Sequence, residues 1–272
     1  MTRAIGVFRM RHSSFLVLGL VLASSATAQV RALPALSQTA APAAPAATPT
    51  SRHRAVQFPP AKTIVSKTVV LTPLKDNTLY QTFDGSLSNG AGVHLFAGAT
   101  NTFQLRRALI AFDVAAQIPP GSTITHVTLV LYESQSIAGS ESTELHRVTA
   151  DWGQGSSDAG TVRDGIGSAS RTGDATWIHT FFPDRRWSKP GGDFDAVADA
   201  IADVNGFGES TWGSSAAMIA RVQDWLDHPS ANFGWIVIGN EATARTAKRF
   251  DSREVVPDST RPALTVDFNT RQ

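Results

Sequence analysis

The sequence predicts an all-β protein, a jelly-roll β-sandwich with one short helix that caps an end. From Lys62 onward, short runs of β-branched and apolar residues are separated by Gly, Asn, Asp and Pro, as strands are separated by turns. These runs do not alternate regularly with helical segments, as they would in an α/β protein. Since the chain has no cysteine, its stability depends on an apolar core, which 42% hydrophobic residues can supply.

The expected strands occur in order along the domain. The clearest run is 123–132 (TITHVTLVLY), in which apolar residues recur with an alternating pattern that indicates one buried face. The segment 196–204 (AVADAIADV) fits either a helix or an edge strand, and we favour the strand. The other expected strands are 63–71, 107–114, 143–148, 175–182, 233–238, 247–250 and 263–268.

One helix is expected near the C-terminal end. Ser214 or Ser215 can cap it, and Pro229 lies just beyond its end. Its apolar residues recur at spacings of three and four: Met218, Ile219, Val222, Trp225 and Leu226.

The N-terminal segment has the features of a secretory signal peptide at residues 1–28. Three arginines precede the apolar stretch 15–23 (FLVLGLVLA), and Ala26-Thr27-Ala28 is a small-x-small cleavage site. Residues 29–61 are rich in Ala and Pro and predict a linker, so the folded domain is expected at 62–272. We therefore expect a secreted, extracellular or periplasmic protein.

Composition argues against several classes of partner. The apolar stretch is shorter than the about 20 residues that a membrane-spanning helix needs, so no transmembrane segment is expected. Without cysteine there is no site for a lipid anchor. Removal of the three signal-peptide arginines changes the net charge from +1 to +1 − 3 = −2, and there is no Lys/Arg run, so we expect no nucleic acid partner.

The motifs of the common enzyme classes are missing from the sequence. There is no Gly-x-Ser-x-Gly, no His-Glu-x-x-His and no phosphate loop. Loop aspartates could in principle form the acid pair of a glycosidase, but nothing in the sequence pairs them, and turn formation explains such residues equally well. We expect no catalytic residues.

Many segments in order resemble the bacterial DNRLRE domain family. They are 76–80 (DNTLY), 90–98 (GAGVHLFAG), 106–113 (RRALIAFD), 118–121 (IPPG), 145–155 (LHRVTADWGQG), 173–182 (GDATWIHTFF), 190–194 (PGGDF), 212–214 (WGS), 222–226 (VQDWL), 232–239 (NFGWIVIG) and 247–254 (AKRFDSRE). The resemblance implies an extracellular β-sandwich related to carbohydrate-binding modules. It also implies that charged residues such as Arg107, Arg249 and Asp251 lie on or beside central strands, where we expect paired charges.

Tryptophan residues are the main candidates for ligand binding, because flat indole faces stack on sugar rings. The best exposed candidate is Trp187, which lies in the charged, Gly/Pro-rich loop 184–192. Trp152 fits a loop anchor or a ligand platform equally well, and Trp177 is undecided. Arg186 within this loop and Asp193 directly after it are the polar candidates.

A structural calcium ion is a further possibility, since exported proteins meet calcium and carboxylates can bind it. Asp76, Asn77, Asp151 and Asp158 are the oxygen-rich candidates, and a simple turn before Leu79 is the alternative for the first two.

The sequence thus favours a secreted, non-catalytic module that binds carbohydrate or a cell-surface polysaccharide. A structural or adhesive module with a protein or matrix partner is the alternative. A polysaccharide-active enzyme is the least favoured reading.

Overall fold

The computed structural model describes residues 62–271. The predicted signal peptide (1–28) and linker (29–61) lie outside the described residues, so both remain predictions. In the described part of the chain, neither α-helix has the length and hydropathy that a membrane span requires.

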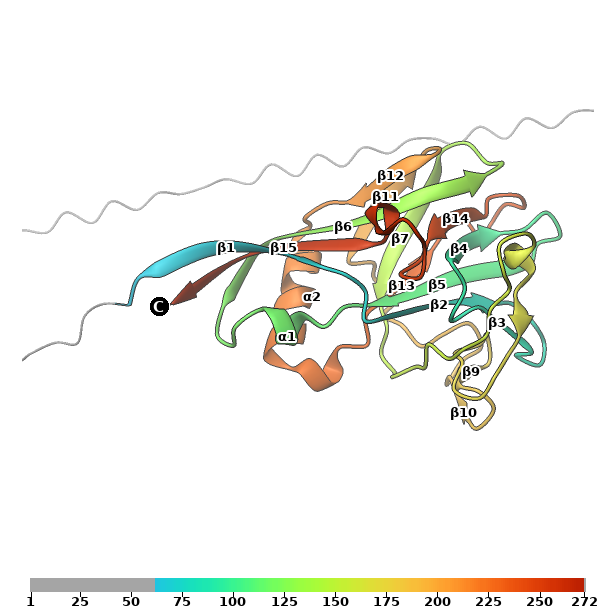
Figure 1. Ribbon diagram of the computed structural model, residues 1–272, viewed down its shortest axis with the longest axis horizontal. Helices are drawn as coiled ribbons and strands as arrows, with labels where there is room; N and C mark the ends of the chain where they lie inside the picture. Colours follow the sequence, from blue (N-terminus) through green and yellow to red (C-terminus); the bar gives the residue numbers. More distant parts are fainter. Residues whose placement is uncertain (1–61, 272) are drawn as a thin grey trace, which may run out of the picture. The chain divides into compact units, whose positions relative to one another are not determined.

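The domain is all-β, as predicted, and α2 is its principal helix (Figure 1). The strands are β1 (Ile64–Leu71), β2 (Lys75–Tyr80), β3 (Leu87–Ser88), β4 (His94–Ala99), β5 (Leu105–Ala111), β6 (Thr123–Ser136), β7 (Glu141–Arg147), β8 (Ser168–Ala169), β9 (His179–Phe181), β10 (Arg185–Arg186), β11 (Ala200–Val204), β12 (Gly208–Trp212), β13 (Trp235–Ile238), β14 (Lys248–Asp251) and β15 (Ala263–Arg271). The helices are α1 (Val114–Gln117) and α2 (Ala216–Asp227), with 3₁₀ turns η1 (Asp164–Ile166), η2 (Pro229–Ala231) and η3 (Asp258–Thr260).

Most strands belong to one curled antiparallel sheet in the order β1-β15-β6-β14-β4-β5-β13-β7-β11, with β12 added to β6 and β2 to β5. Strand β4 forms the corner of this sheet, because its first residues pair with β14 and its last two with β5. Gly98 lies at the change of partner with φ 114°, and a Cβ there would be 2.9 Å from the carbonyl oxygen of Thr246. Only glycine fits this backbone without strain.

The main core lies between the two halves of the curled sheet. Alternate residues of β6, among them Val127, Leu129 and Leu131, are fully buried, which confirms the period-two pattern seen in the sequence. Helix α2 adds its apolar face to this core, and the ring of Trp225 packs edge-on against Trp235 at 4.5 Å between centroids. The helix begins as predicted, with the Ser215 hydroxyl accepting a hydrogen bond from the Met218 amide.

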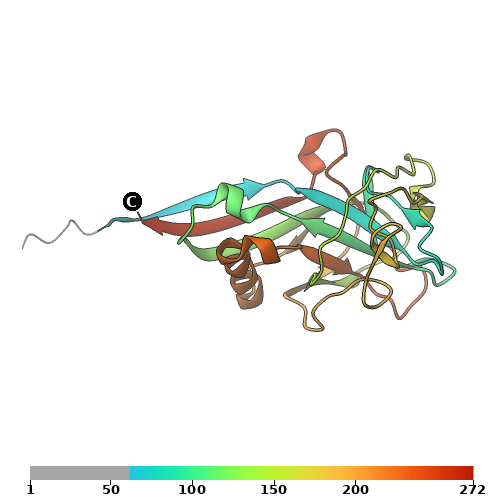
Figure 2. The same ribbon diagram turned by 90° about the horizontal axis from the view of Figure 1, so that it is seen from below.

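A second apolar cluster, here called the outer cluster, lies on the opposite face of β2, β5 and β13. The sheet contributes Leu79, Leu109, Ala111 and Ile236, and the long segment 148–194 contributes Val148, Trp152, Ala175, Trp177 and Trp187. Figures 1 and 2 show β9 and β10 of this segment at the opposite end of the domain from α2. The segment therefore folds as a covering layer over the sheet.

Several element predictions were wrong in detail. Strand β2 includes Asp76 and Asn77, where a turn was the alternative, because long-range hydrogen bonds satisfy both buried side chains. Only His179–Phe181 of the expected strand 175–182 is a strand. β5 ends at Ala111 rather than at 114, because Asp113 caps α1 by accepting from the Ala116 amide. Within 196–204, the strand reading is confirmed by β11.

Candidate functional site

The candidate site is a cavity of about 510 Å³, here called the arginine pocket. It lies where the end of β6, the start of β14, strand β5 and the η1 turn meet. Its lining residues are Phe96, Ala99, Thr100, Asn101, Arg106, Gln135, Ser136, Ile137, Val162, Arg163, Asp164, Gly165, Ile166, Arg245, Ala247 and Arg249. Cavities of a few hundred Å³ are the usual size for small-molecule ligands.

Arg106 is a buried residue in the lining of this pocket. Its guanidinium carbon lies 4.7 Å from the centre of the Tyr80 ring, and its Nε donates to the Gly165 carbonyl at 3.1 Å. Burial lowers the pKa of Arg106 below its usual value, and the nearby Tyr80 opposes this shift. Burial also raises the pKa of the Tyr80 hydroxyl, which donates to the Asp164 carbonyl at 2.9 Å. Both residues thus fix the η1 turn against the sheet.

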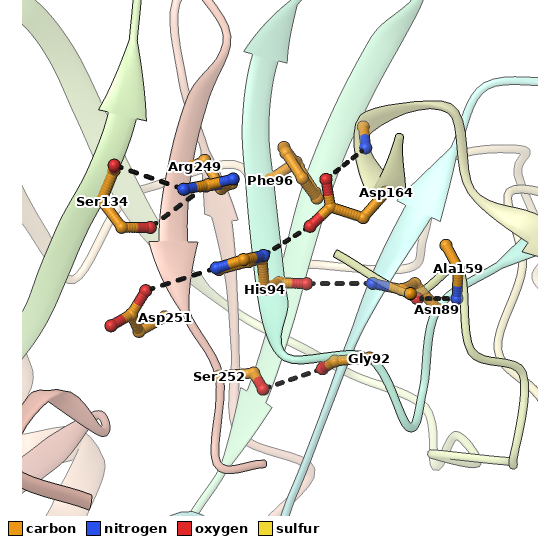
Figure 3. Close-up of polar contacts among 12 residues, drawn as sticks. Asn89, Gly92, His94, Phe96, Ser134, Ala159, Asp164, Arg249, Asp251 and Ser252 are labelled. Atoms are coloured by element: carbon orange, nitrogen blue, oxygen red, sulfur yellow. Dashed lines mark hydrogen bonds and ion pairs between the residues drawn. The ribbon is translucent and has the colours of Figure 1, made fainter. Parts of the chain in front are cut away.

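The other three arginines of the pocket differ in their exposure and in their hydrogen bonds. Arg249 on β14 is half-buried and donates to the hydroxyl and carbonyl of Ser134 at 3.1 and 3.3 Å (Figure 3). Arg163 and Arg245 are exposed, and Arg245 has φ 68°, a conformation that non-glycine residues rarely adopt. This strained residue lies in the turn before β14. In the same turn, the Thr246 hydroxyl donates to the carbonyl oxygens of Asn240 and Thr243.

The only carboxylate among the lining residues, Asp164, is buried and already has partners (Figure 3). One oxygen contacts Nδ1 of His94, and the other accepts from the Gly165 amide at 3.0 Å. The opposite ring nitrogen of His94 faces Asp251 at 3.7 Å. This arrangement ties η1 to β4 and β14, so Asp164 holds the wall of the pocket.

Four arginines against one aspartate give the lining a formal charge of 4 − 1 = +3, although the whole chain is near neutral. Arginine presents a planar fork of donors that matches carboxylate, sulfate and phosphate groups. The arrangement is therefore suited to binding an anion, with Asn101 and Gln135 available at the edge for hydroxyl groups.

The prediction that Trp187 is exposed was wrong. Its side chain is 5% exposed and belongs to the outer cluster, and its indole nitrogen donates to the Thr176 carbonyl at 2.8 Å. The flanking residues 184–186 and 188–190 lie at the surface, while the indole turns inward to anchor the covering segment and Gly191 and Gly192 are buried with it.

The other two candidate tryptophans are also buried. Trp152 is 1% exposed, and its indole nitrogen donates to the Phe233 carbonyl at 2.8 Å. Trp177 is 7% exposed and lies beneath Arg107, whose guanidinium carbon is 4.9 Å from the ring centre. Trp152 therefore offers no free face on which a sugar ring could stack, and Trp177 presents only a small part of its surface, to a cavity of about 780 Å³ that it lines with Phe83 and Pro190.

Arg186 and Asp193 do not lie in the arginine pocket either. Arg186 is exposed in the short strand β10. The Asp193 carboxylate accepts from the Ser188 hydroxyl at 2.6 Å and from the amides of Ser188 and Lys189 at 2.8 and 3.1 Å. Asp193 thus braces its own loop.

The four calcium candidates make contacts with different partners. Asp76 accepts from the Arg253 amide, and the Asn77 oxygen accepts from the Asn89 amide. Asp151 pairs with Lys75 at 2.8 Å, and Asp158 accepts from the Gly160 amide. No group of three His, Cys, Asp or Glu residues suited to a metal ion occurs within 62–271. The structure does not bring these four residues together as ligands of one ion.

The arginine pocket was not foreseen from the sequence. Arg106, Arg163, Arg245 and Arg249 are spread over three separate regions of the chain, and no run of basic residues marks them. Arg249 was expected in a charge pair between strands, yet its hydrogen bonds go to Ser134.

A comparison of the chain with protein-family models finds no match, and neither does a search of curated proteins.

Proposed function

We propose that this protein is a secreted, non-catalytic module that binds an acidic polysaccharide in the arginine pocket. The observation that carries this proposal is the gathering of four arginines around one cavity of about 510 Å³ in a chain with little net charge. The signal-peptide pattern and the resemblance to modules of the DNRLRE family support secretion and a saccharide ligand.

The four arginines differ in whether they already have protein partners, and this difference supports a role in binding. Arg106 and Arg249 have protein partners and shape the wall, while Arg163 and Arg245 are exposed at its edge. An exposed guanidinium can form paired hydrogen bonds to a carboxylate or sulfate group of a polysaccharide ligand. Burying such a ligand beside low-dielectric protein strengthens these bonds relative to open solvent.

A non-catalytic role is supported by the hydrogen bonds that the Asp164 carboxylate already makes within the protein. Hydrolysis of a glycosidic bond needs a carboxyl group free to exchange a proton with the ligand. Asp164 is instead engaged by His94 and the Gly165 amide, and its backbone carbonyl accepts from Tyr80. We therefore assign this carboxylate to the structure of the pocket.

The test is isothermal titration of the purified chain with neutral, carboxylated and sulfated polysaccharides. We expect saturable binding to acidic glycans only, weakened by added salt because exposed charges are screened. Arg163→Ala and Arg245→Asn should each weaken binding about threefold to tenfold, consistent with loss of a partly exposed charge-assisted hydrogen bond. Asparagine is chosen at 245 because it tolerates the positive φ there.

Arg171→Ala is the matched control, since Arg171 is exposed and does not line the pocket. Equal binding of neutral and acidic glycans, or equal loss with Arg171→Ala, would contradict the proposal. Silence across all glycans from folded protein would favour the structural or adhesive alternative. Release of reducing ends that depends on Asp164 would favour an enzyme.

A further inference from the structure

Three exposed aliphatic side chains line the arginine pocket beside its charges. Val162 is 90% exposed, Ile137 is 71% exposed and Ile166 is 54% exposed. They come from two parts of the chain, the turn after β6 and the η1 region, and meet only because the fold brings these together. Single exposed aliphatic residues are common, but a group around one cavity is a feature of binding surfaces.

The packing of the domain does not account for these side chains. None of the three belongs to the main core or to the outer cluster. Beneath them, Phe96 is 7% exposed and gives the pocket an apolar floor beside Arg106. The pocket is thus amphipathic, with guanidinium groups and hydrocarbon surface in one cavity.

An acidic sugar without substituents would use only half of this lining. Its carboxylates would pair with the arginines, while its hydroxyl-rich ring would leave the aliphatic rim in contact with water. A ligand that carries both an anionic group and a compact apolar group would use both parts, because each buried methyl group gains free energy. Polar residues such as Thr100 and Gln135 interrupt the aliphatic surface, so the apolar group must be small.

We infer that the arginine pocket selects an acidic polysaccharide that bears small acyl substituents, such as O-acetyl groups. The arginines take the acid group, and Ile137, Val162 and Ile166 contact the acyl methyl. This inference rests on the proposed function of the pocket and adds to it the kind of acidic glycan that is preferred.

The test compares one naturally O-acetylated polyuronate before and after mild alkaline de-O-acetylation, by isothermal titration with the purified chain. The acetylated form should bind about threefold to tenfold more tightly, in line with the burial of one or two methyl groups. Val162→Ser and Ile137→Ser should remove this preference, because each should weaken binding of the acetylated form more than binding of the deacetylated form. Val256→Ser is the control, since Val256 is 83% exposed and does not line the pocket.

The outcomes separate the two proposals. Equal affinity for both forms, with sensitivity to Arg163→Ala retained, overturns the acyl inference and leaves anion binding intact. Absence of binding to either form, from folded protein, overturns both. Tighter binding to vesicles of anionic phospholipid than to either glycan also overturns the inference, because the apolar rim would then serve lipid chains.

Discussion

At the scale of single residues, Asp76 is a carboxyl group in an environment that disfavours its charge. It is 1% exposed on β2, and its carboxylate accepts from the Arg253 amide at 2.8 Å. Burial raises the pKa of Asp76 well above its usual 3.8, the negative charge of Glu254 adds to this, and the Arg253 amide and charge oppose it. The folded state therefore holds a proton on Asp76 more tightly than the unfolded state does.

This shift predicts how stability depends on pH. Because the folded pKa is raised, the stabilising contribution is fully present below the unfolded pKa of about 3.8 and is lost as pH rises toward the folded value. Asp76→Asn removes the ionisation and keeps an acceptor for Arg253. Relative to wild type, the variant should gain unfolding free energy progressively as the pH rises from 4 to 8, because only the wild type must ionise a buried carboxyl group over this range.

Denaturant unfolding at several pH values measures this difference. Asp84→Asn is the control, because Asp84 is exposed and its pKa is lowered by hydrogen bonds from Ser86, so its effect falls below pH 4. Parallel stability curves for wild type and Asp76→Asn across pH 4–8 would show that Asp76 carries no raised pKa.

Among the elements, those with local signals could be predicted from the sequence and those fixed by distant partners could not. β6 was predicted because its apolar residues recur with the period of a strand, and β13 because it is a short, continuous apolar run. The cap of α2 was predicted because Ser215 acts on an amide three residues away. β2 was missed because Asn77 is polar, and two of the groups that satisfy it, the carbonyls of Gln154 and Ala175, lie far along the chain.

The covering segment 148–194 shows the same limit for the site. Its Gly, Pro and charged residues are typical of an exposed loop, and this pattern suggested a free indole at Trp187. The segment instead needs buried anchors, because it has few strands of its own and must be held against the sheet. The arginine pocket could not be predicted from the sequence for a related reason. Its four arginines come from separate parts of the chain, and only the fold brings them together.

Trp187→Ala tests the anchoring role of this segment. Removing a buried indole and its hydrogen bond to Thr176 should lower the free energy of unfolding by about 3–5 kcal/mol. Arg186→Ala, at the exposed neighbour, should change it by less than about 0.5 kcal/mol. Denaturant unfolding followed by tryptophan fluorescence measures both. Unfolding of Trp187→Ala at the wild-type midpoint would mean that the indole does not anchor the segment.

For the domain as a whole, two apolar clusters on opposite faces of one sheet imply two levels of stability. β13 pairs on both sides, with β5 and with β7, and it contributes Trp235 and Val237 to the main core. Within the described residues, the covering segment forms no strand ladder with the main sheet. Isolated backbone hydrogen bonds hold it, such as those from the Gly153 amide to Thr180 and from the Ala175 amide to Gly153 within the segment, and from the Val148 amide to Gly234 at its edge. It can therefore detach while the strand ladders of the sheet remain paired.

Native-state hydrogen exchange separates these levels. Amides of the covering segment, Gly153 and Ala175 among them, should exchange through a local opening with a free energy several kcal/mol below that of the amides of β13. Low denaturant should hardly change their exchange, because a local opening exposes little surface, whereas β13 should respond with the slope of global unfolding. Equal protection of both groups would mean that the clusters unfold as one unit. In that case the outer cluster and the sheet would form one cooperative unit, and the covering segment would have no separate local opening.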